Sequence, residues 1–394
     1  MTVTMNPDGV HIGIDATNIR GGGGVTHLQE MLDAAIPESA GIGRITLWTG
    51  SATAALMPKR SWLRTRTLPW MDAGMLRRLW GQQFDLPAEV RREGCNVLFS
   101  PGGTSPTWSP VPVVTMSQNM LPFESGEAAR FGRWSPMRLK MRLLRLSQGR
   151  SFRRAAGVVF LTEYARAGVS KAVGGLACPT VIVPHGVATR FQKPPRRQRQ
   201  VADITRQAPF RLLYVSIVMP YKHQTTIARA AIQLVRLGVP IEVRFVGAPW
   251  EPYAAEFRAT LDDLDPQRRF LKWDGSAAFE DLHSLYQAAD AFVFASSCEN
   301  LPNILIEAMS AGLPIACSSR GPMPEVLKDA GIYFDPESTA DTARALRELF
   351  EDAVQRERIA HRAWQEAQAY SWNRCADQTL GFIARIAQRQ LGET

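Results

Sequence analysis

The chain has 394 residues and a formal net charge of +9, from 46 basic and 37 acidic side chains. Hydrophobic residues make up 45% of the sequence and charged residues 21%, a balance that is ordinary for a globular protein and excludes a disordered one. The length predicts two to three domains, and the positive charge favours acidic partners, namely nucleotide phosphates, nucleic acid or an anionic membrane.

Two further features bear on location. No apolar run approaches the roughly 18 residues that cross a bilayer, and the N-terminal sequence MTVTMNPDGVHIGID has no apolar core typical of a signal peptide. The cysteines are dispersed without a C-x-x-C pair, which argues against a disulfide framework and a structural zinc site. We therefore expect a cytoplasmic protein that touches the inner face of a membrane at most peripherally. The five cysteines are Cys95, Cys178, Cys298, Cys317 and Cys375.

Short apolar runs alternate with longer amphipathic stretches in the first half of the chain. This alternation is typical of parallel strands that are covered by helices on both faces of a sheet. The predicted strands are residues 11–15, 45–48, 96–99, 113–116, 157–161 and 180–183.

A polar, basic and proline-containing segment, residues 192–209, then predicts an interdomain linker. The alternation restarts after it, so we expect two Rossmann-like domains, residues 1–195 and 205–372, with a ligand cleft at the carboxyl ends of their strands. A C-terminal helix of about 373–394 is expected to pack back on the first domain. The later predicted strands are 212–216, 241–246, 270–273, 291–295, 314–318 and 331–334, and the helices lie near 223–237, 251–262, 279–288, 303–311 and 338–368.

The segment 296–314, SSCENLPNILIEAMSAGLP, has the pattern of an anion site. Pro302 suits the first turn of a helix, where a missing N–H costs nothing, and Gly312 suits its C-terminal cap. The backbone N–H groups around 301–304 are then free, and with the helix dipole they favour a diphosphate. Glu299 before the helix and Glu307 about one turn into it can accept hydrogen bonds from sugar hydroxyls. The alternative is that both glutamates are solvated surface residues.

The spacing E-x7-E in this segment, continued as ENLPNILIEAMSAGLPIACSSRGPMPEVLKDAGIYFDP, resembles the donor-site signature of retaining GT-B glycosyltransferases of family 4, the glycosyl transferases group 1. DLHSLYQAADAFVF, VIVPHGVATRF, FLTEYAR and the glycine run 21–24 resemble further parts of that family. The resemblance covers most of the chain and is stronger after residue 210. It implies an α/β protein with the GT-B fold, two Rossmann-like domains with a cleft between them, and no metal requirement.

The resemblance also implies roles for individual residues. Glu307 would accept hydrogen bonds from ribose hydroxyls, and Glu299 would hold hydroxyls of the donor sugar. Lys222, in VSIVMPYKH, matches the lysine that neutralises the diphosphate as the glycosidic bond breaks, although a lysine taken alone is usually a surface residue. The amides that follow Glu299 would hold sugar and phosphate, and they belong to Asn300, Leu301, Asn303 and Ile304.

The chain departs from the family pattern at two places. The arginine expected beside the lysine falls on Ile217, which cannot pair with phosphate, so another cation such as Arg320 or Arg190 would have to substitute. The family often has His-Asp where this chain has Gln118 and Asn119. These amides cannot act as a general base, but they can hydrogen-bond a donor sugar or an acceptor. Simple turn chemistry is an equal alternative for them.

Glycines complete the predicted donor site. The run 21–24 precedes a helix, so Gly23 and Gly24 let a ligand approach the backbone and the helix N-terminus. The nucleobase is expected near 273–276, which includes Gly275. No metal constellation is present, because the D-x-D of residues 263–265 ends a polar helix and is expected to be solvated. We therefore expect no metal and no cofactor beyond the nucleotide-sugar donor.

Residues 128–156 contain nine basic side chains and no acidic one. Arg138, Arg142 and Arg145 recur at helical spacing between two apolar rows, which favours a helix packed within the first domain. Docking to an anionic membrane or an acidic acceptor is the alternative, and a second basic stretch at 59–78, with Trp62 and Trp70, adds to it. The two rows are Met137, Met141 and Leu144 on one side and Leu139, Leu143 and Leu146 on the other.

We therefore predict a retaining hexosyltransferase. It would move a hexose from GDP-mannose or a UDP-sugar to a glycan or lipid-linked glycan during surface polysaccharide biosynthesis. A nucleotide-sugar epimerase with the same fold and a basic nucleic-acid-binding protein are the alternatives, and Ile217 also leaves open an inactive scaffold. No nucleic-acid motif is recognisable, so no nucleic-acid partner is expected.

Overall fold

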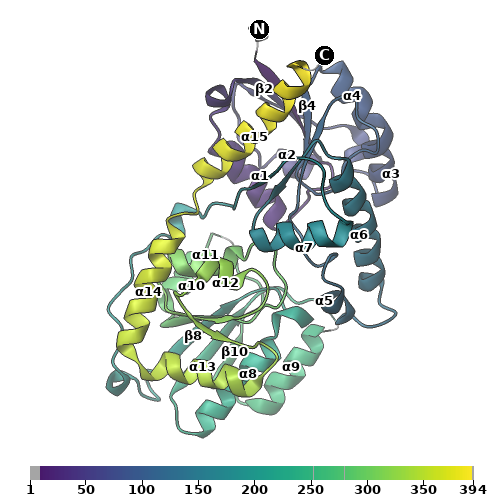
Figure 1. Cartoon of the computed structure of the whole chain (residues 1–394). Helices are drawn as coiled ribbons and strands as arrows, with labels where there is room; N and C mark the ends of the chain where they lie inside the picture. The colour runs from purple at the N-terminus through teal and green to yellow at the C-terminus, as the bar shows by residue number, and fades with distance from the viewer. Residues whose placement is uncertain (1–8, 252, 279, 393–394) are drawn as a thin grey trace. The chain divides into compact units, whose positions relative to one another are not determined.

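The computed structural model describes residues 9–251, 253–278 and 280–392, and its contacts divide them into two compact units (Figure 1). Unit 1 contains residues 9–124, 134–186 and 371–392, and unit 2 contains 125–133 and the described part of 187–370. This division differs from the predicted one, because residues 125–133 and 187–195 belong to unit 2. The chain passes from one unit to the other after residues 124, 133, 186 and 370.

Unit 1 is built on a parallel sheet with the strand order β3-β2-β1-β4-β5-β6-β7. Its strands are β1 (Val10–Asp15), β2 (Ile42–Trp48), β3 (Leu63–Arg66), β4 (Val97–Ser100), β5 (Val113–Met116), β6 (Gly157–Phe160) and β7 (Thr180–Ile182). The edge strand β3 was not predicted, because Leu63 is its only apolar residue and the neighbouring sequence is basic. The other six strands lie within three residues of their predicted bounds.

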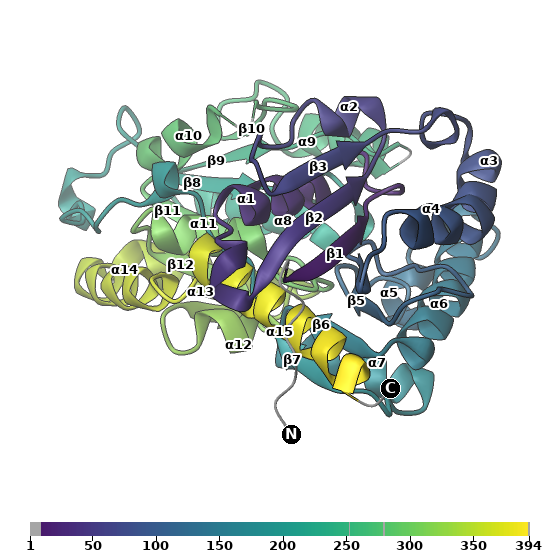
Figure 2. The ribbon, with the colours of Figure 1, turned by 90° about the horizontal axis from the view of Figure 1, so that it is seen from above.

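Helices surround this sheet (Figure 2). They are α1 (Gly23–Asp33), α2 (Ser51–Ala54), α3 (Met75–Trp80), α4 (Leu86–Arg92), α6 (Pro136–Arg154), α7 (Glu163–Val173) and α15 (Trp372–Gly392), with short turns η1 (Pro37–Ala40), η2 (Pro69–Met71) and the π-helical η3 (Gly81–Asp85). The last helix, α15, contacts β1, β4, β6 and α1. Gly157 permits this approach, because a Cβ there would lie 2.9 Å from the ring of Phe382.

Unit 2 is built on a second parallel sheet with the strand order β10-β9-β8-β11-β12-β13. Its strands are β8 (Phe210–Val215), β9 (Ile241–Val246), β10 (Leu271–Trp273), β11 (Ala291–Phe294), β12 (Ile315–Ser318) and β13 (Ile332–Phe334). Its helices are α5 (Ser125–Ala129), α8 (Gln224–Arg236), α9 (Tyr253–Leu264), α10 (Leu282–Ala288), α11 (Asn303–Ser310), α12 (Met323–Leu327), α13 (Thr339–Glu351) and α14 (Ala353–Ala367), with turns η4 (Thr189–Phe191), η5 (Val201–Asp203) and η6 (Pro220–Lys222).

The helix predicted over 338–368 is broken at Asp352. This residue has an extended backbone (φ −114°, ψ 96°), and its carboxylate accepts a hydrogen bond of 2.8 Å from the Gln355 N–H. Aspartate competes well for the N-cap of a helix, so α14 begins anew after it. The expectation that the D-x-D of residues 263–265 is solvated is wrong for its second aspartate. Asp265 is buried and accepts hydrogen bonds from the backbone N–H groups of Phe270 and Leu271 at 2.7 and 2.9 Å.

The predicted linker 192–209 is instead a packed part of unit 2. Arg196 and Arg199 both pair with the buried carboxylate of Asp290, and the buried Arg356 donates to the carbonyl of Arg199. These arginines made the segment look like a solvated linker, whereas they bind a buried acid. Among the described residues, no helix is both long and apolar enough to span a bilayer.

Candidate active site

The loop between β8 and α8 holds a buried lysine. Lys222 ends the turn η6, and the Tyr214 hydroxyl donates to its backbone carbonyl. His223 then adopts a left-handed conformation (φ 51°), which turns the chain directly into α8. The lysine side chain is therefore fixed at the carboxyl end of β8, where ligands bind in open parallel sheets.

The ammonium of Lys222 pairs with the carboxylate of Glu299. Its Nζ also lies 5.0 Å from the ring centroid of Tyr221 and 5.7 Å from that of Phe294. The lysine and glutamate side chains are only 7% and 16% exposed, so water screens their attraction less than at an open surface. The structure thus brings together two predicted site residues that are 77 positions apart in the chain.

Ile217, which replaces the expected arginine, is 38% exposed, and its carbonyl accepts a hydrogen bond from the Gln224 amide. Both cations considered as substitutes already have acidic neighbours. The Arg320 guanidinium lies 3.2 Å from both carboxylate oxygens of Asp335, and Arg190 lowers the pKa of Glu307. The Lys222 ammonium is therefore the cation that this structure places against Glu299.

Glu307 is buried on α11, only 9% exposed, and it accepts a hydrogen bond of 2.9 Å from the Tyr286 hydroxyl. Burial raises the pKa of its carboxyl group to about 7, against the opposing effects of this hydrogen bond and of Arg190. The solvated alternative for Glu307 is therefore wrong.

One backbone N–H group at the start of α11 that was expected to be free is hydrogen-bonded within the chain. Pro302 is the N-cap of this helix, and the Asn303 N–H, expected to be free, donates to the Leu301 carbonyl at 3.0 Å. Asn300 and Leu301 are buried, whereas Asn303 and Ile304 are half-buried. At the other end Gly312 has φ 67°, as its predicted role in the cap requires.

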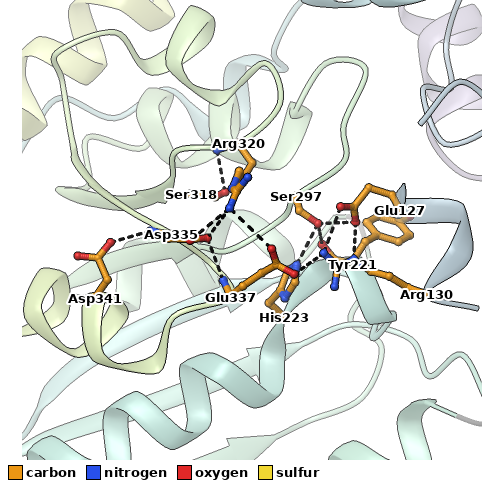
Figure 3. Close-up of polar contacts among 10 residues, drawn as sticks. All are labelled: Glu127, Arg130, Tyr221, His223, Ser297, Ser318, Arg320, Asp335, Glu337 and Asp341. Carbon is orange, nitrogen blue, oxygen red and sulfur yellow. Dashed lines mark hydrogen bonds and ion pairs between the residues drawn. The ribbon is translucent and has the colours of Figure 1, made fainter. Parts of the chain in front are cut away.

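A short helix from the first half of the chain lies against the loop after β11, where Glu127 faces Ser297 (Figure 3). In α5, Glu127 accepts a hydrogen bond of 2.6 Å from the Ser297 hydroxyl. Arg130, which directly follows α5, bridges Glu127 and Glu337 at 2.7 and 2.6 Å. Because Ser297 donates to Glu127, its oxygen is free to accept the N–H of His223 Nε2 at 2.9 Å. Burial, reinforced by Arg130, lowers the pKa of His223 to about 4, so its ring is neutral at pH 7.

We expect Arg130→Met to lower the free energy of unfolding by about 1 to 3 kcal/mol, because it leaves the half-sequestered Glu127 carboxylate without its charged partner. Chemical denaturation would measure the change. Arg258→Met is the matched control, since Arg258 and Glu251 form an exposed pair and its loss is expected to cost at most about 1 kcal/mol. Equal effects of the two substitutions would contradict the anchoring role of Arg130.

The predicted site residues from the first half of the chain lie in unit 1. The Gln118 amide nitrogen lies 3.1 Å from His27 Nδ1, and a Cβ added to Gly24 would meet the Gln118 oxygen at 3.6 Å. His27 is fully buried, and burial holds its pKa well below the usual value, so Nδ1 can accept the amide N–H. Gln118 thus lies beside the start of α1, whose first two residues are Gly23 and Gly24. Asn119 accepts the Leu121 N–H at 3.0 Å, as turn chemistry predicts.

Gly275 lies at the carboxyl end of β10 in unit 2, with φ 73°. Its carbonyl accepts the Gly247 N–H at 2.7 Å, and the Gly247 carbonyl accepts the indole N–H of Trp273 at 3.0 Å. Gly247 in turn lies against β8, because a Cβ there would be 1.8 Å from the Ser216 carbonyl oxygen. The loops after β8, β9 and β10 are therefore held together at one edge of the sheet.

Sequence patterns did not reveal four of the residues around these groups. Tyr286 and His27 each bind a predicted residue, but both lie in ordinary amphipathic helices. Glu127 and Arg130 reach unit 2 from the other half of the chain, which no local pattern indicates. Within the described ranges, no group of three His, Cys, Asp or Glu side chains is arranged to hold a metal ion.

Solved structures share this α/β architecture of two parallel sheets. HepE of Anabaena in complex with UDP and glucose superposes with a TM-score of 0.67 at 19% identity, covering 98% of this chain and 100% of that chain. WaaG, a glycosyltransferase involved in lipopolysaccharide biosynthesis, gives a TM-score of 0.68 at 16% identity, covering 95% and 99%. The protein therefore has the GT-B fold of glycosyltransferases.

Sequence comparison places the second half of the chain more narrowly. Residues 197–366 match the family model described as Glycosyl transferases group 1. The O-antigen chain mannosyltransferase B of Escherichia coli is 28% identical over 172 residues, which are 43% of this chain and 44% of that protein. The chain thus spans less than half the length of this curated relative. Lys222, Glu299 and Glu307 all lie within the residues that match the family model.

Proposed function

We propose that this protein is a retaining glycosyltransferase that moves a hexose from a nucleotide diphosphate sugar to a glycan or lipid-linked glycan. The observation that carries the proposal is the pairing of Lys222 with Glu299 between the start of α11 and the end of β8. A cation there stabilises the negative charge that grows on a leaving diphosphate. The neighbouring carboxylates of Glu299 and Glu307 suit sugar and ribose hydroxyls, respectively.

In the proposed reaction the acceptor hydroxyl oxygen bonds to the anomeric carbon while the bond from that carbon to the diphosphate oxygen breaks. The bonding electron pair stays on the diphosphate, and a phosphate oxygen takes the acceptor proton. No side-chain base is then required, which fits amide side chains at Gln118 and Asn119. The donor would be GDP-mannose or a UDP-sugar, bound without a metal or another cofactor.

The biological setting is part of the proposal. One relative acts on the O-antigen chain by its name, and one structural neighbour takes part in lipopolysaccharide biosynthesis. The resemblance supports a role for this chain in building a surface polysaccharide. An acceptor of that kind is consistent with a cytoplasmic enzyme that works at the inner membrane face.

Nucleoside diphosphates are expected to raise the thermal stability of the protein. A ligand that binds only the folded state at a concentration of 100 times its Kd adds about 2.7 kcal/mol. A thermal-shift panel of GDP, UDP and ADP, with the matching monophosphates as controls, would identify the base. The expected result is one preferred base and a smaller shift with its monophosphate. No shift with any diphosphate at millimolar concentration would contradict the proposed donor site.

A further inference from the structure

The exposed face of α6 is apolar along its centre. Leu139, Leu143 and Leu146 are 58%, 59% and 71% exposed, whereas Met141 and Phe152 on the opposite face are buried. At about 100° per residue, the three leucines fall within about 60° of one another around the helix axis. The prediction that both apolar rows of this helix pack is therefore wrong for the leucine row.

Cations flank this leucine row on both sides. At the same angular spacing, Arg142 and Arg153 lie on one side of the leucines, and Lys140 and Arg154 lie on the other. All four side chains are exposed. Since residues 128–156 contain no acidic residue, the charges on this helix are uniformly positive. An apolar strip bordered by cations is the pattern of a helix that lies at a lipid surface.

A second apolar group lies beside α6. Leu76, Trp80 and Phe84, in α3 and η3, are between 59% and 78% exposed. The ring centroids of Trp80 and Phe84 lie 4.4 Å apart. The inner side of η3 is anchored, because Gly81 packs directly on the buried ring of Trp70. Trp70 thus belongs to the core and does not take part in docking. The exposed residues Leu76, Trp80 and Phe84 are the ones available for it.

One loop joins the two groups. Gln83 of η3 binds the backbone of Ser105 and Thr107 at 3.3 and 2.8 Å, and Ser151 and Arg154 of α6 bind the same two residues at 3.1 and 3.2 Å. In both views α3, α4 and α6 lie along one side of unit 1 (Figures 1 and 2). The elements that carry the leucine row and the aromatic pair therefore lie on one side of the same unit.

We propose that this surface docks unit 1 on an anionic lipid bilayer. The docking surface consists of Leu76, Trp80, Phe84, Leu139, Leu143 and Leu146 together with the surrounding arginines and lysine. The leucines and aromatic rings enter the boundary between headgroups and acyl chains, and the cations meet the lipid phosphates. Lipid phosphates are the better partner than a second copy of this chain, because two copies would oppose positively charged helices.

Vesicle binding tests this proposal. The full-length protein is expected to co-sediment with phosphatidylcholine vesicles that contain phosphatidylglycerol, at least tenfold more than with phosphatidylcholine alone, and less at high salt. Replacing Leu139, Leu143 and Leu146 together with serine is expected to lower binding at least tenfold. The control replaces Leu237 and Val354, which are equally exposed in unit 2, with serine and is expected to bind like the parent.

Nucleoside diphosphate binding by thermal shift serves as the check on folding, and it separates this proposal from the proposed donor site. The triple variant should keep the parent's nucleotide response, since its leucines lie outside unit 2. Failure of the parent to bind anionic vesicles, or undiminished binding by the triple variant, overturns the proposal. So does self-association of the parent that the triple variant abolishes without any vesicle binding, because the surface would then join two copies of the chain.

Discussion

Replacing Lys222 with alanine is expected to lower kcat for sugar transfer by about two to three orders of magnitude. In the proposed reaction the ammonium stabilises charge that develops on the diphosphate in the transition state, and removing one such preorganised group typically costs that much. The substitution also leaves Glu299 as an unpaired carboxylate beside the proposed diphosphate site, so KM should rise as well. Turnover of the nucleotide sugar whose diphosphate stabilises the protein most would measure both constants.

Two further variants separate the loss of charge stabilisation in the transition state from the effect of leaving Glu299 without its ion-pair partner. In Lys222→Ala combined with Glu299→Gln, the unpaired carboxylate is gone, so the free energy of unfolding should recover towards the parent value while kcat stays low. Lys272→Ala is the control, because Lys272 pairs with Glu242 in the same unit on an exposed surface. A kcat for Lys222→Ala within threefold of the parent value would refute the role assigned to this lysine.

The Glu307→Gln variant is expected to be more stable than the parent at pH 8 by about 3 kcal/mol in the absence of ligand. In the folded chain the Glu307 carboxyl keeps its proton up to a pKa of about 7, whereas its ordinary value is near 4.5. The unfolded chain therefore releases this proton first, and the free energy of unfolding falls as the pH rises between these two values. Glutamine keeps the acceptor for Tyr286 but cannot ionise.

The pH profile of the parent alone would not isolate this effect. Burial lowers the pKa of His27 and His223, and these groups make the folded state more stable as the pH rises through the same range. The difference between the variant and the parent cancels them, so it should be near zero at pH 4.5 and grow towards pH 8. Glu256→Gln, on the exposed side of α9, is the control. A difference that is constant with pH would contradict the raised pKa of Glu307.

The parts of the site that sequence could predict are local in the chain. The strand, loop and helix around Glu299 follow from a short apolar run, a proline and a glycine, and the structure has all three elements near their predicted bounds. The pairing of Lys222 with Glu299 was not predicted, because it depends on β8 and β11 lying side by side in the sheet. Strand order is a tertiary property that the spacing of apolar residues does not specify.

Other differences have equally physical causes. Arginines in the segment 192–209 gave it the composition of a linker, but composition cannot show that two of them pair with the buried carboxylate of Asp290. The helix over 136–154 was predicted with two apolar faces, and only the packing of unit 1 decides which face meets the sheet. The chain leaves unit 1 for the nine residues 125–133, which include α5 and belong to unit 2, and then returns to unit 1. No local sequence pattern indicates such an excursion.

The return of α15 to unit 1 has a consequence for how the protein is made. A ribosome finishes the first 186 residues early, yet the face of β1, β4 and β6 that α15 covers must wait for the last stretch of the chain. Unit 2 is complete once residue 370 has emerged. N-terminal domains usually fold first during synthesis. Here unit 2 is complete before unit 1, because unit 1 still lacks α15 when residue 370 has been added. Until residues 371–392 have been added, the face of β1, β4 and β6 that α15 covers stays exposed.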